Sequence, residues 1–299
     1  MFALGHQGHT SMTDAGPIDI AKLAAWIGRQ ETANDTITLA PPAALSATLD
    51  RDDPRPAAGD ALPPLWHWLF FTPLHRQSDI GPDGHARRGG FLPPVELPRR
   101  MWAGGRLQFG APLRIADSVR RTSTIADVSM KDGRSGPLVF VRVRHEITSS
   151  SGGSLTEEND IVYRGAPAPG DSAPPAKPAP AGAVWRRDIA PDDVLLFRYS
   201  ALTFNSHRIH YDRRYATEVE RYPGLVVHGP LIATLIADLL RRQTMRPMRA
   251  FNFRAVSPLF DIAPFAICGA PNADGTAARL WAQNASGGLA MEADATFAA

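Results

Sequence analysis

A nine-residue stretch, residues 204–212, carries the densest set of groups in this sequence that could do chemistry. It holds two histidines, His207 and His210, with an amide, an arginine and an acid between and around them. A histidine titrates near neutrality and can both accept and donate a proton. The stretch therefore indicates a site of proton transfer.

A second stretch begins at His228 and Gly229 and has the apolar spacing of a buried helix. A helix N-terminus offers unpaired backbone N–H groups and a partial positive charge, which suit an oxygen that becomes negative during a reaction. We therefore expect this helix entry to hold an oxyanion. The apolar face is formed by Leu231, Ile232, Leu235, Ile236, Leu239 and Leu240.

A segment rich in proline and alanine divides the elements that must position these groups. Residues 165–182 contain almost no large apolar side chain, so we interpret them as an extended linker. We expect residues 1–16 to be a disordered tail, residues 17–164 to form an N-terminal domain, and residues 183–299 to form a C-terminal domain.

The first half combines helical and strand patterns. Apolar spacing predicts helices over residues 19–29 and 43–49, and the aromatic residues 65–71 indicate a buried strand. Alternating, β-branched residues 138–147 predict a strand with one wet face, on which we expect His145 to face solvent or a subunit contact.

The second half repeats this order around the long helix. A short strand over residues 194–200 is expected to lead into the polar stretch. Helix followed by antiparallel strands in both halves indicates a weak internal duplication. The later strands are predicted over residues 248–253, 265–269, 279–284 and 288–297.

A loop in the first half gathers arginines beside glycines. Arg87, Arg88 and Arg100 lie in or near this loop. Flexible glycines with clustered arginines suit phosphate groups, but a solvated basic surface explains the pattern equally well.

Composition excludes several classes of protein. A net charge of +2 gives no case for nucleic acid as a partner. The single cysteine, Cys268, excludes an internal disulfide framework and a cysteine metal cluster. No apolar run is long enough to cross a bilayer, and residues 1–16 are unlike a signal peptide, so we expect a cytoplasmic protein without a membrane partner.

The order of these elements resembles the MaoC-like branch of the hot-dog fold. The hydratases of that branch carry an Asp-x-Asn-Pro-x-His motif and, later, a His-Gly pair at the entry of a helix. Here Asn205 stands at the motif's aspartate, His207 at its asparagine, Arg208 at its proline and His210 at its histidine. The usual acid is therefore an amide in this chain.

A sub-branch is more similar still: two-domain hydratases of C4-dicarboxylic acyl-CoAs, such as mesaconyl-C4-CoA and itaconyl-CoA, together with the type 2 3-hydroxyacyl-thioester dehydratases. The resemblance spans most of residues 17–299. It rests on residues 66–68, 88–94, 99–105, 197–205 and 208–212.

This resemblance implies an α+β protein with a double hot-dog fold, in which two antiparallel sheets each wrap a central helix and only the C-terminal domain is catalytic. It implies a hydro-lyase that adds water to an α,β-unsaturated acyl-CoA, with no metal and no cofactor beyond the substrate's own CoA. Two such chains could pair as a homodimer of pseudo-dimers.

The resemblance also implies roles for single residues. His210 would be the general base and acid, and the Gly229 N–H would bind the thioester oxygen. Asn205 would hold the attacking water through its carbonyl oxygen and could donate a hydrogen bond from its NH₂ group. Contacts to the substrate are expected from His207, Arg208, His228, Arg254, Arg249, Arg87, Arg88 and Arg100.

Three alternatives remain open. A dehydratase acting on long acyl chains held by a carrier protein would need a deep, apolar tunnel. A non-catalytic acyl-CoA binding module would explain the loss of the motif's acid. A thioesterase is disfavoured, because no carboxylate stands out as its nucleophile or base.

Overall fold

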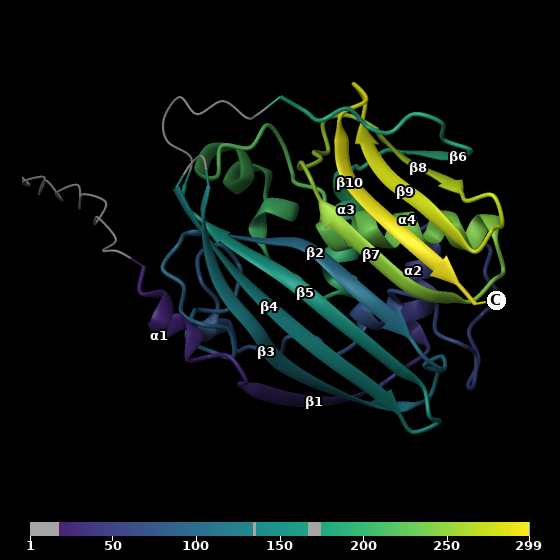
Figure 1. Cartoon of the computed structure of the whole chain (residues 1–299), viewed down its shortest axis with the longest axis horizontal. Helices are drawn as coiled ribbons and strands as arrows, with labels where there is room; N and C mark the ends of the chain where they lie inside the picture. The colour runs from purple at the N-terminus through teal and green to yellow at the C-terminus, as the bar shows by residue number, and fades with distance from the viewer. Residues whose placement is uncertain (1–17, 134–135, 167–174, 299) are drawn as a thin grey trace, which may run out of the picture.

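A single antiparallel sheet of ten strands runs through the whole molecule (Figure 1). The computed structural model describes residues 18–133, 136–166 and 175–298. The strand order is β1-β3-β4-β5-β2-β7-β10-β9-β8-β6. The strands are β1 (Gln30–Thr36), β2 (Arg99–Phe109), β3 (Ser118–Gly133), β4 (Gly136–Ser149), β5 (Ser154–Arg164), β6 (Trp185–Ile189), β7 (Met248–Ala255), β8 (Phe265–Pro271), β9 (Ala277–Asn284) and β10 (Leu289–Phe297).

The two halves of the chain join where β2 pairs with β7. Gly104 lies opposite Arg254 in this pairing, and a Cβ added to Gly104 would lie only 2.5 Å from the carbonyl oxygen of Phe253. A glycine is therefore needed for the strands to approach this closely. Five strands on either side of this seam make the pseudo-symmetric sheet of a double hot-dog fold.

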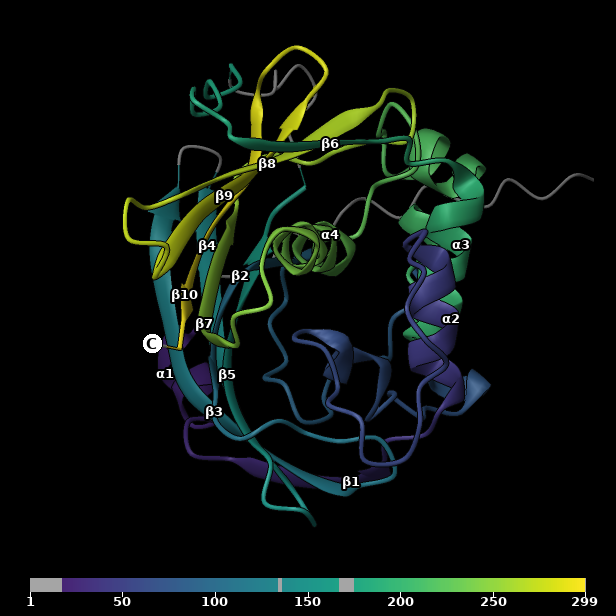
Figure 2. The ribbon, with the colours of Figure 1, turned by 90° about the vertical axis from the view of Figure 1, so that its right-hand side faces the viewer.

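The C-terminal half wraps its strands around α4 (Gly229–Gln243), which lies inside the curve of the sheet (Figure 2). Ten consecutive residues of this helix, 231–240, are buried. A helix that is buried on all sides must be apolar nearly all round, so the long run of leucine, isoleucine and alanine is explained by its position. The predicted central helix is confirmed for this half.

The N-terminal half differs from the expectation. The part of this half that the structure describes has no helix inside the curve of its strands. Its helices are α1 (Ile20–Ala24) and α2 (Ala40–Thr48), and α2 packs against α3 (Asp193–Leu202) on the opposite side of the molecule (Figure 2). The expectation of a central helix in each half is therefore wrong for this half, whose concave face borders a cavity instead.

Two segments that were expected to be strands are helical. The aromatic residues of Trp66–Leu69 form a 3-10 turn, which follows two prolines and Leu65 at a positive φ of 69°. Residues 194–200 belong to α3, whose N-cap residue, Asp192, accepts a hydrogen bond from the Leu195 backbone. An acidic side chain in this position stabilises a helix start and outweighs the strand propensity that follows it.

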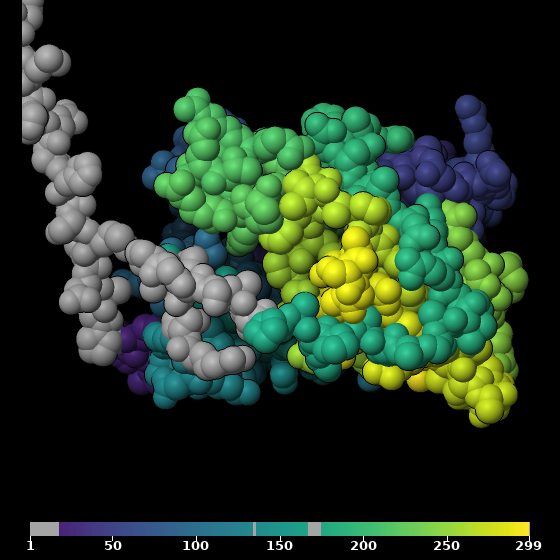
Figure 3. Space-filling model, turned by 90° about the horizontal axis from the view of Figure 1, so that it is seen from above, coloured from purple at the N-terminus to yellow at the C-terminus, as the bar shows by residue number. Residues whose placement is uncertain are grey.

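The structure describes only part of the predicted linker. The predicted tail, residues 1–16, and residues 167–174 of the linker lie outside the described residues. Residues 175–182 run along the C-terminal strands (Figure 3). The backbone N–H of Ala179 donates to the carbonyl oxygen of Gly287. The division of the chain into two domains at this segment stays a prediction.

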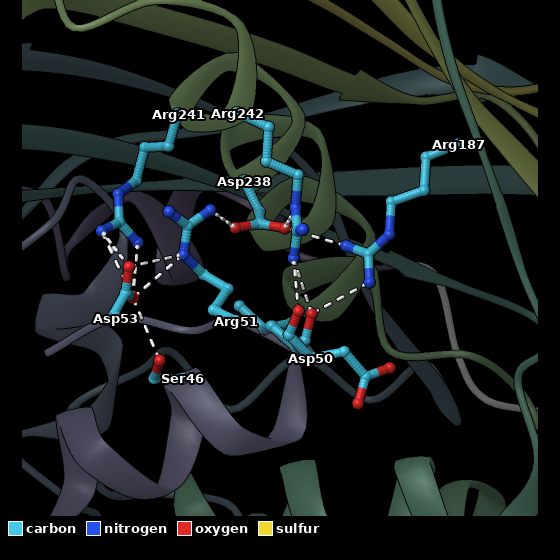
Figure 4. A network of polar contacts seen from close by, with 9 residues as sticks. Ser46, Asp50, Arg51, Asp53, Arg187, Asp238, Arg241 and Arg242 are labelled. Atoms are coloured by element: carbon cyan, nitrogen blue, oxygen red, sulfur yellow. Dashed lines mark hydrogen bonds and ion pairs between the residues drawn. The ribbon is translucent and has the colours of Figure 1, made fainter.

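A buried acid fixes the last turn of α4 against both halves (Figure 4). The carboxylate of Asp238 is fully buried and accepts hydrogen bonds from Arg51 at 2.7 Å, Arg187 at 2.8 Å and Arg242 at 2.8 Å. Arg51 also binds Asp53, which lies beside α2. The network ties the central helix to the N-terminal half at the end away from the helix entry.

Candidate functional site

The end of α3 places Asn205. The backbone N–H of Asn205 donates to Ser200 at 2.8 Å and that of Phe204 donates to Ala201 at 3.4 Å, which is the pair of bonds of a Schellman motif. Phe204 takes a positive φ of 50°, a conformation that usually belongs to glycine. This turn ends the helix and directs the Asn205 side chain to the cavity described below.

The amide of Asn205 is oriented by its own backbone. Its Oδ1 accepts a hydrogen bond of 3.0 Å from the His207 N–H. Its NH₂ group has no hydrogen-bond partner among the residues that the structure describes. The oxygen has a second lone pair that can still accept a hydrogen bond from a water, so its expected role stays a prediction. The free NH₂ group can donate to a ligand.

His210 ends a short 3-10 turn, Arg208–His210, and is fixed as one tautomer. Its Nδ1 lies 2.7 Å from the carbonyl oxygen of Val226. A carbonyl only accepts, so Nδ1 must carry the proton and Nε2 keeps a free lone pair. Burial lowers the pKa of His210 to about 4, although the bond to Val226 acts in the opposite direction. His210 is therefore a neutral imidazole able to accept a proton near pH 7.

Four histidine rings form a continuous row. His210 stacks on His228 with centroids 3.8 Å apart, and it meets His207 edge-on at 5.3 Å. His207 lies 3.9 Å from His85. Burial is the main cause that lowers the pKa of all four, and for His207 burial and its histidine neighbours lower it to about 2. The row is uncharged at neutral pH.

The fourth histidine comes from the N-terminal half, which sequence reasoning did not associate with this cluster. His85 donates its ring Nδ1–H and its backbone N–H to the two oxygens of Asp83, at 2.9 and 3.0 Å. These bonds, against the opposing effect of burial, hold the pKa of Asp83 well below its usual range. The basic, glycine-rich loop was noticed only for its arginines.

A glycine allows this loop to dock. A Cβ on Gly84 would lie 1.8 Å from the carbonyl oxygen of Ser206, and Gly84 has a φ of 90°. The Ser206 hydroxyl donates to the Gly84 carbonyl at 2.5 Å, and the backbone N–H of Arg208 donates to the backbone carbonyl of Asp83 at 2.9 Å. The backbone of the N-terminal loop is thus hydrogen-bonded to the polar stretch of the other half.

The entry of α4 faces open space. His228 is the N-cap, and its Nε2 lies 2.8 Å from the buried hydroxyl of Ser200. Within the described ranges the N–H of Gly229 has no acceptor, and no atom lies within 4 Å of where its Cβ would be. Pro230, the next residue, lines the cavity. The free N–H of Gly229 can therefore serve a ligand oxygen.

A cavity of about 1380 Å³ lies between the two halves. This is enough for an acyl group with part of its CoA arm. His207, His210, His228 and Gly229 are not among its lining residues, but Ser206 and Pro230, which neighbour them in the chain, are. Among the predicted site residues and the newly found His85, the wall includes Asn205, His85, Arg87, Arg88 and Arg100.

The N-terminal strands and the 3-10 turn Trp66–Leu69 supply another part of the wall. Trp68 of this turn and Trp102 of β2 line the cavity and contact each other, with ring centroids 5.0 Å apart. His145 also lines it and shares a hydrogen bond of 2.9 Å with Ser123, so the expectation that His145 faces solvent or a subunit contact is wrong. Burial lowers the pKa of His145 to about 4.

Three predicted substrate contacts lie elsewhere. Arg249 and Arg254 are exposed on β7 and do not line the cavity, and Arg254 pairs with Glu292 at 2.6 Å. Arg208 binds Asp212 at 2.7 Å and lies over the Tyr215 ring. We leave these three out of the site, because side chains on the far face of a strand cannot reach the cavity and Arg208 already has its partner.

Asp83, His85 and His207 also form a possible cation site, since their ligand atoms lie within 4.8 Å of one another. Both oxygens of Asp83 already accept hydrogen bonds from His85. This set therefore fits a hydrogen-bonded pair at least as well as a metal centre.

No helix in the described residues is long and apolar enough to cross a membrane.

Two known proteins are similar to this chain over most of its length. Mesaconyl-C(4)-CoA hydratase of Chloroflexus aurantiacus is 49% identical over 90% of this chain and 95% of its own length. The mitochondrial hydroxyacyl-thioester dehydratase type 2 of Schizosaccharomyces pombe is 31% identical over 70% and 77%, respectively.

Solved structures support the fold alone. A MaoC-like dehydratase from Phytophthora capsici, 14% identical, aligns over 94% of this chain and 99% of its own with a TM-score of 0.66. A Mycobacterium tuberculosis protein described as a double hot-dog fold, 15% identical, aligns over 90% and 96% with a TM-score of 0.51. Residues 65–261 match the family described as hydroxyacyl-thioester dehydratase type 2, and this chain therefore belongs to that family.

Proposed function

We propose that this protein adds water reversibly across the double bond of an α,β-unsaturated acyl-CoA, with mesaconyl-C4-CoA as its substrate. One observation carries the reaction type: His210 is held as a neutral base with a free Nε2, in a cluster that also contains the unpaired N–H of Gly229. The relative at 49% identity supports the choice of acyl group.

The proposed reaction uses three groups. Nε2 of His210 takes a proton from water as its oxygen attacks Cβ, and the Gly229 N–H binds the thioester oxygen, which becomes an enolate. The imidazolium then returns the proton to Cα. The hydroxyl of the water is thus added to Cβ and its proton to Cα, and His210 is regenerated. The NH₂ group of Asn205 donates to the oxygen that is being added or to a neighbouring group of the substrate.

The row of histidines supports proton transfer at one position. His207 and His228 flank His210 and are neutral near pH 7, so neither carries an extra proton that it could give to Cα in place of His210. His228 has its Nε2 committed to Ser200. We assign His228 a positioning role beneath His210.

The test is a panel of mono- and dicarboxylic enoyl-CoAs, followed by the loss of absorbance of the conjugated thioester. We expect the highest kcat/KM with mesaconyl-C4-CoA, itaconyl-CoA being the next dicarboxylic candidate. His210→Gln removes the imidazole that accepts the proton, so kcat should fall at least about a hundredfold. Turnover that survives this change would contradict the mechanism, and binding without turnover by the wild type would leave only an acyl-CoA binding module.

A second candidate is the dehydration of 3-hydroxyacyl groups on a carrier protein, favoured by the family match and the yeast relative. The same panel separates the two, because a carrier dehydratase would prefer long, uncharged acyl chains. The proposed chemistry uses no cofactor beyond the substrate's CoA. Pairing of two copies and a cytoplasmic location stay predictions.

A further inference from the structure

Arg100 is an arginine of the cavity wall that the proposed chemistry does not yet use. It lies on β2, is half-buried and lines the cavity together with His85 and Asn205. Within the described residues no carboxylate pairs with it. A half-buried guanidinium without a counter-ion in a ligand-sized cavity suits an anionic group of the ligand.

Other arginines around the same loop already have partners. Arg88 donates to the carbonyl oxygens of Val95 and Leu97. Arg99 pairs with Glu220 at 3.2 Å and lies over the ring of Tyr222. The donors of these two side chains are held by other groups, whereas Arg100 has the hydroxyl of Tyr163 beside it and no carboxylate partner among the described residues.

Arg100 also lies on the same side of the cavity as the histidine row. Burial is the main reason that the pKa values of His85 and His207 are low, and the positive charge of Arg100 lowers them further. Arg100 is directly opposite Tyr163 in the pairing of β2 with β5. It is therefore close to the polar cluster, whereas the exposed Arg87 is the better candidate for a CoA phosphate at the cavity mouth.

The acids near this cluster are already engaged. Asp83 is bound by His85 through both oxygens, and Glu220 is bound by Arg99 and by the Tyr215 hydroxyl. A ligand carboxylate would therefore meet the positive charge of Arg100, while the hydrogen bonds from His85 offset part of the negative charge of Asp83.

In mesaconyl-C4-CoA the free carboxylate is attached to Cβ, the carbon that receives the water. It must then lie one bond from the reacting centre, beside Asn205. We propose that Arg100 binds this free carboxylate, with the Asn205 NH₂ group as a second donor, and so selects dicarboxylic over simple enoyl-CoAs. The inference rests on the proposed function and adds the residue that determines the substrate class.

The test compares two thioesters that differ only in this group. In 3-methylcrotonyl-CoA a methyl replaces the carboxylate of mesaconyl-C4-CoA, and all contacts to CoA are kept. Arg100→Met should lower kcat/KM for mesaconyl-C4-CoA at least about 30-fold, the loss typical when one partner of a desolvated charge pair is removed. The inhibition constant of 3-methylcrotonyl-CoA should change less than about threefold, and Arg100→Lys should recover part of the rate because it restores the charge.

The control is Arg279→Met on β9, an exposed arginine outside the cavity, which should behave as wild type. Equal weakening of both thioesters by Arg100→Met would mean that Arg100 contacts CoA, and no change in either would mean that it binds neither group; each result overturns the inference. A folded Arg100→Met protein is verified by its thermal unfolding curve. If the wild type does not hydrate mesaconyl-C4-CoA at all, the proposed function fails before this comparison begins.

Discussion

The ring of His85 lies 3.9 Å from the ring of His207, although 121 residues separate them in the chain. This contact extends a cluster of the C-terminal half with a histidine and an acid of the N-terminal half. The resemblance implied a non-catalytic first half that contributes only contacts to the substrate, and this pair adds a part of the polar cluster that it did not imply. Its Asp83–His85 pair brings a carboxylate back to a site whose own motif has an amide at the position of the acid.

Gly84→Ala tests whether this contact matters for activity. The new Cβ would lie 1.8 Å from the Ser206 carbonyl oxygen, and since both are backbone positions the loop must move away. We expect kcat to fall at least about tenfold, because a displacement of about 1 Å is enough to disturb a reacting geometry. Steady-state kinetics and the thermal midpoint are measured together.

The matched control is Gly59→Ala. Gly59 has nearly the same φ, 89°, but no atom lies within 4 Å of its Cβ position. It therefore shares the backbone strain without the collision. An equal loss of activity in both variants would attribute the effect to strain alone and contradict a role for loop docking.

The buried histidines should make stability depend on pH. The folded pKa of His210 is about 4, below the ordinary value of 6.5, so between these values the unfolded chain binds a proton that the folded protein does not. The free energy of unfolding must then fall as the pH drops from 6.5 to 4, by about 3 kcal/mol from His210 alone. His85, His207 and His228 act in the same direction.

Urea unfolding at a series of pH values measures this slope. In His210→Gln the proton-binding difference at this position is gone, so the curve should be less steep than in the wild type. A slope that is unchanged by the substitution would mean that His210 does not titrate as a buried neutral group.

The parts of the site that could be predicted from the sequence are those formed by residues close together in the chain. Asn205, His207 and His210 are close in sequence, so their proximity in space could be predicted, and the helix that begins at Gly229 has a long apolar pattern. The docking of His85 could not, since it depends on a loop that reaches across the molecule. Its only local signal was Gly84 between two polar residues, which many turns share.

The type of an element was predicted wrongly where tertiary context outweighed a local propensity or where a capping residue was not considered. Tryptophan and phenylalanine favour strands, but Trp66–Leu69 follows Pro63 and Pro64 and turns instead. Asp192 is an N-cap residue that could have predicted the start of α3 from the sequence. Arg249 was assigned to the cavity because charge was considered without the face of the strand from which the side chain extends.

Asp238→Asn should destabilise the fold more than any surface charge change. The substitution leaves Arg51, Arg187 and Arg242 without their shared anion in a buried setting. Removing one partner from such a group typically costs about 3 kcal/mol or more. The exposed pair Asp188–Arg186 offers the control, because Asp188→Asn should change stability by less than about 1 kcal/mol. Equal midpoints for the two variants would contradict a stabilising role for the buried network.

Asn205→Asp tests the amide that replaces the usual acid. An aspartate can still accept the His207 N–H, so the local turn is kept, but the free NH₂ donor is lost and a negative charge takes its place. That charge should raise the pKa of His210 and move the acidic limb of the kcat/KM profile upward from the wild-type position near pH 4. Activity with uncharged enoyl-CoAs should remain measurable.

The dicarboxylic substrate should respond differently. Its free carboxylate would lie beside the new aspartate, so repulsion should lower kcat/KM for mesaconyl-C4-CoA more than for crotonyl-CoA, by a further tenfold or about 1.4 kcal/mol. Asn205→Ala removes the donor without adding charge and should affect the two substrates more evenly. If Asn205→Asp instead improves the rate with mesaconyl-C4-CoA, the carboxylate does not lie beside residue 205, and the aspartate has taken over the role it has in the related motif.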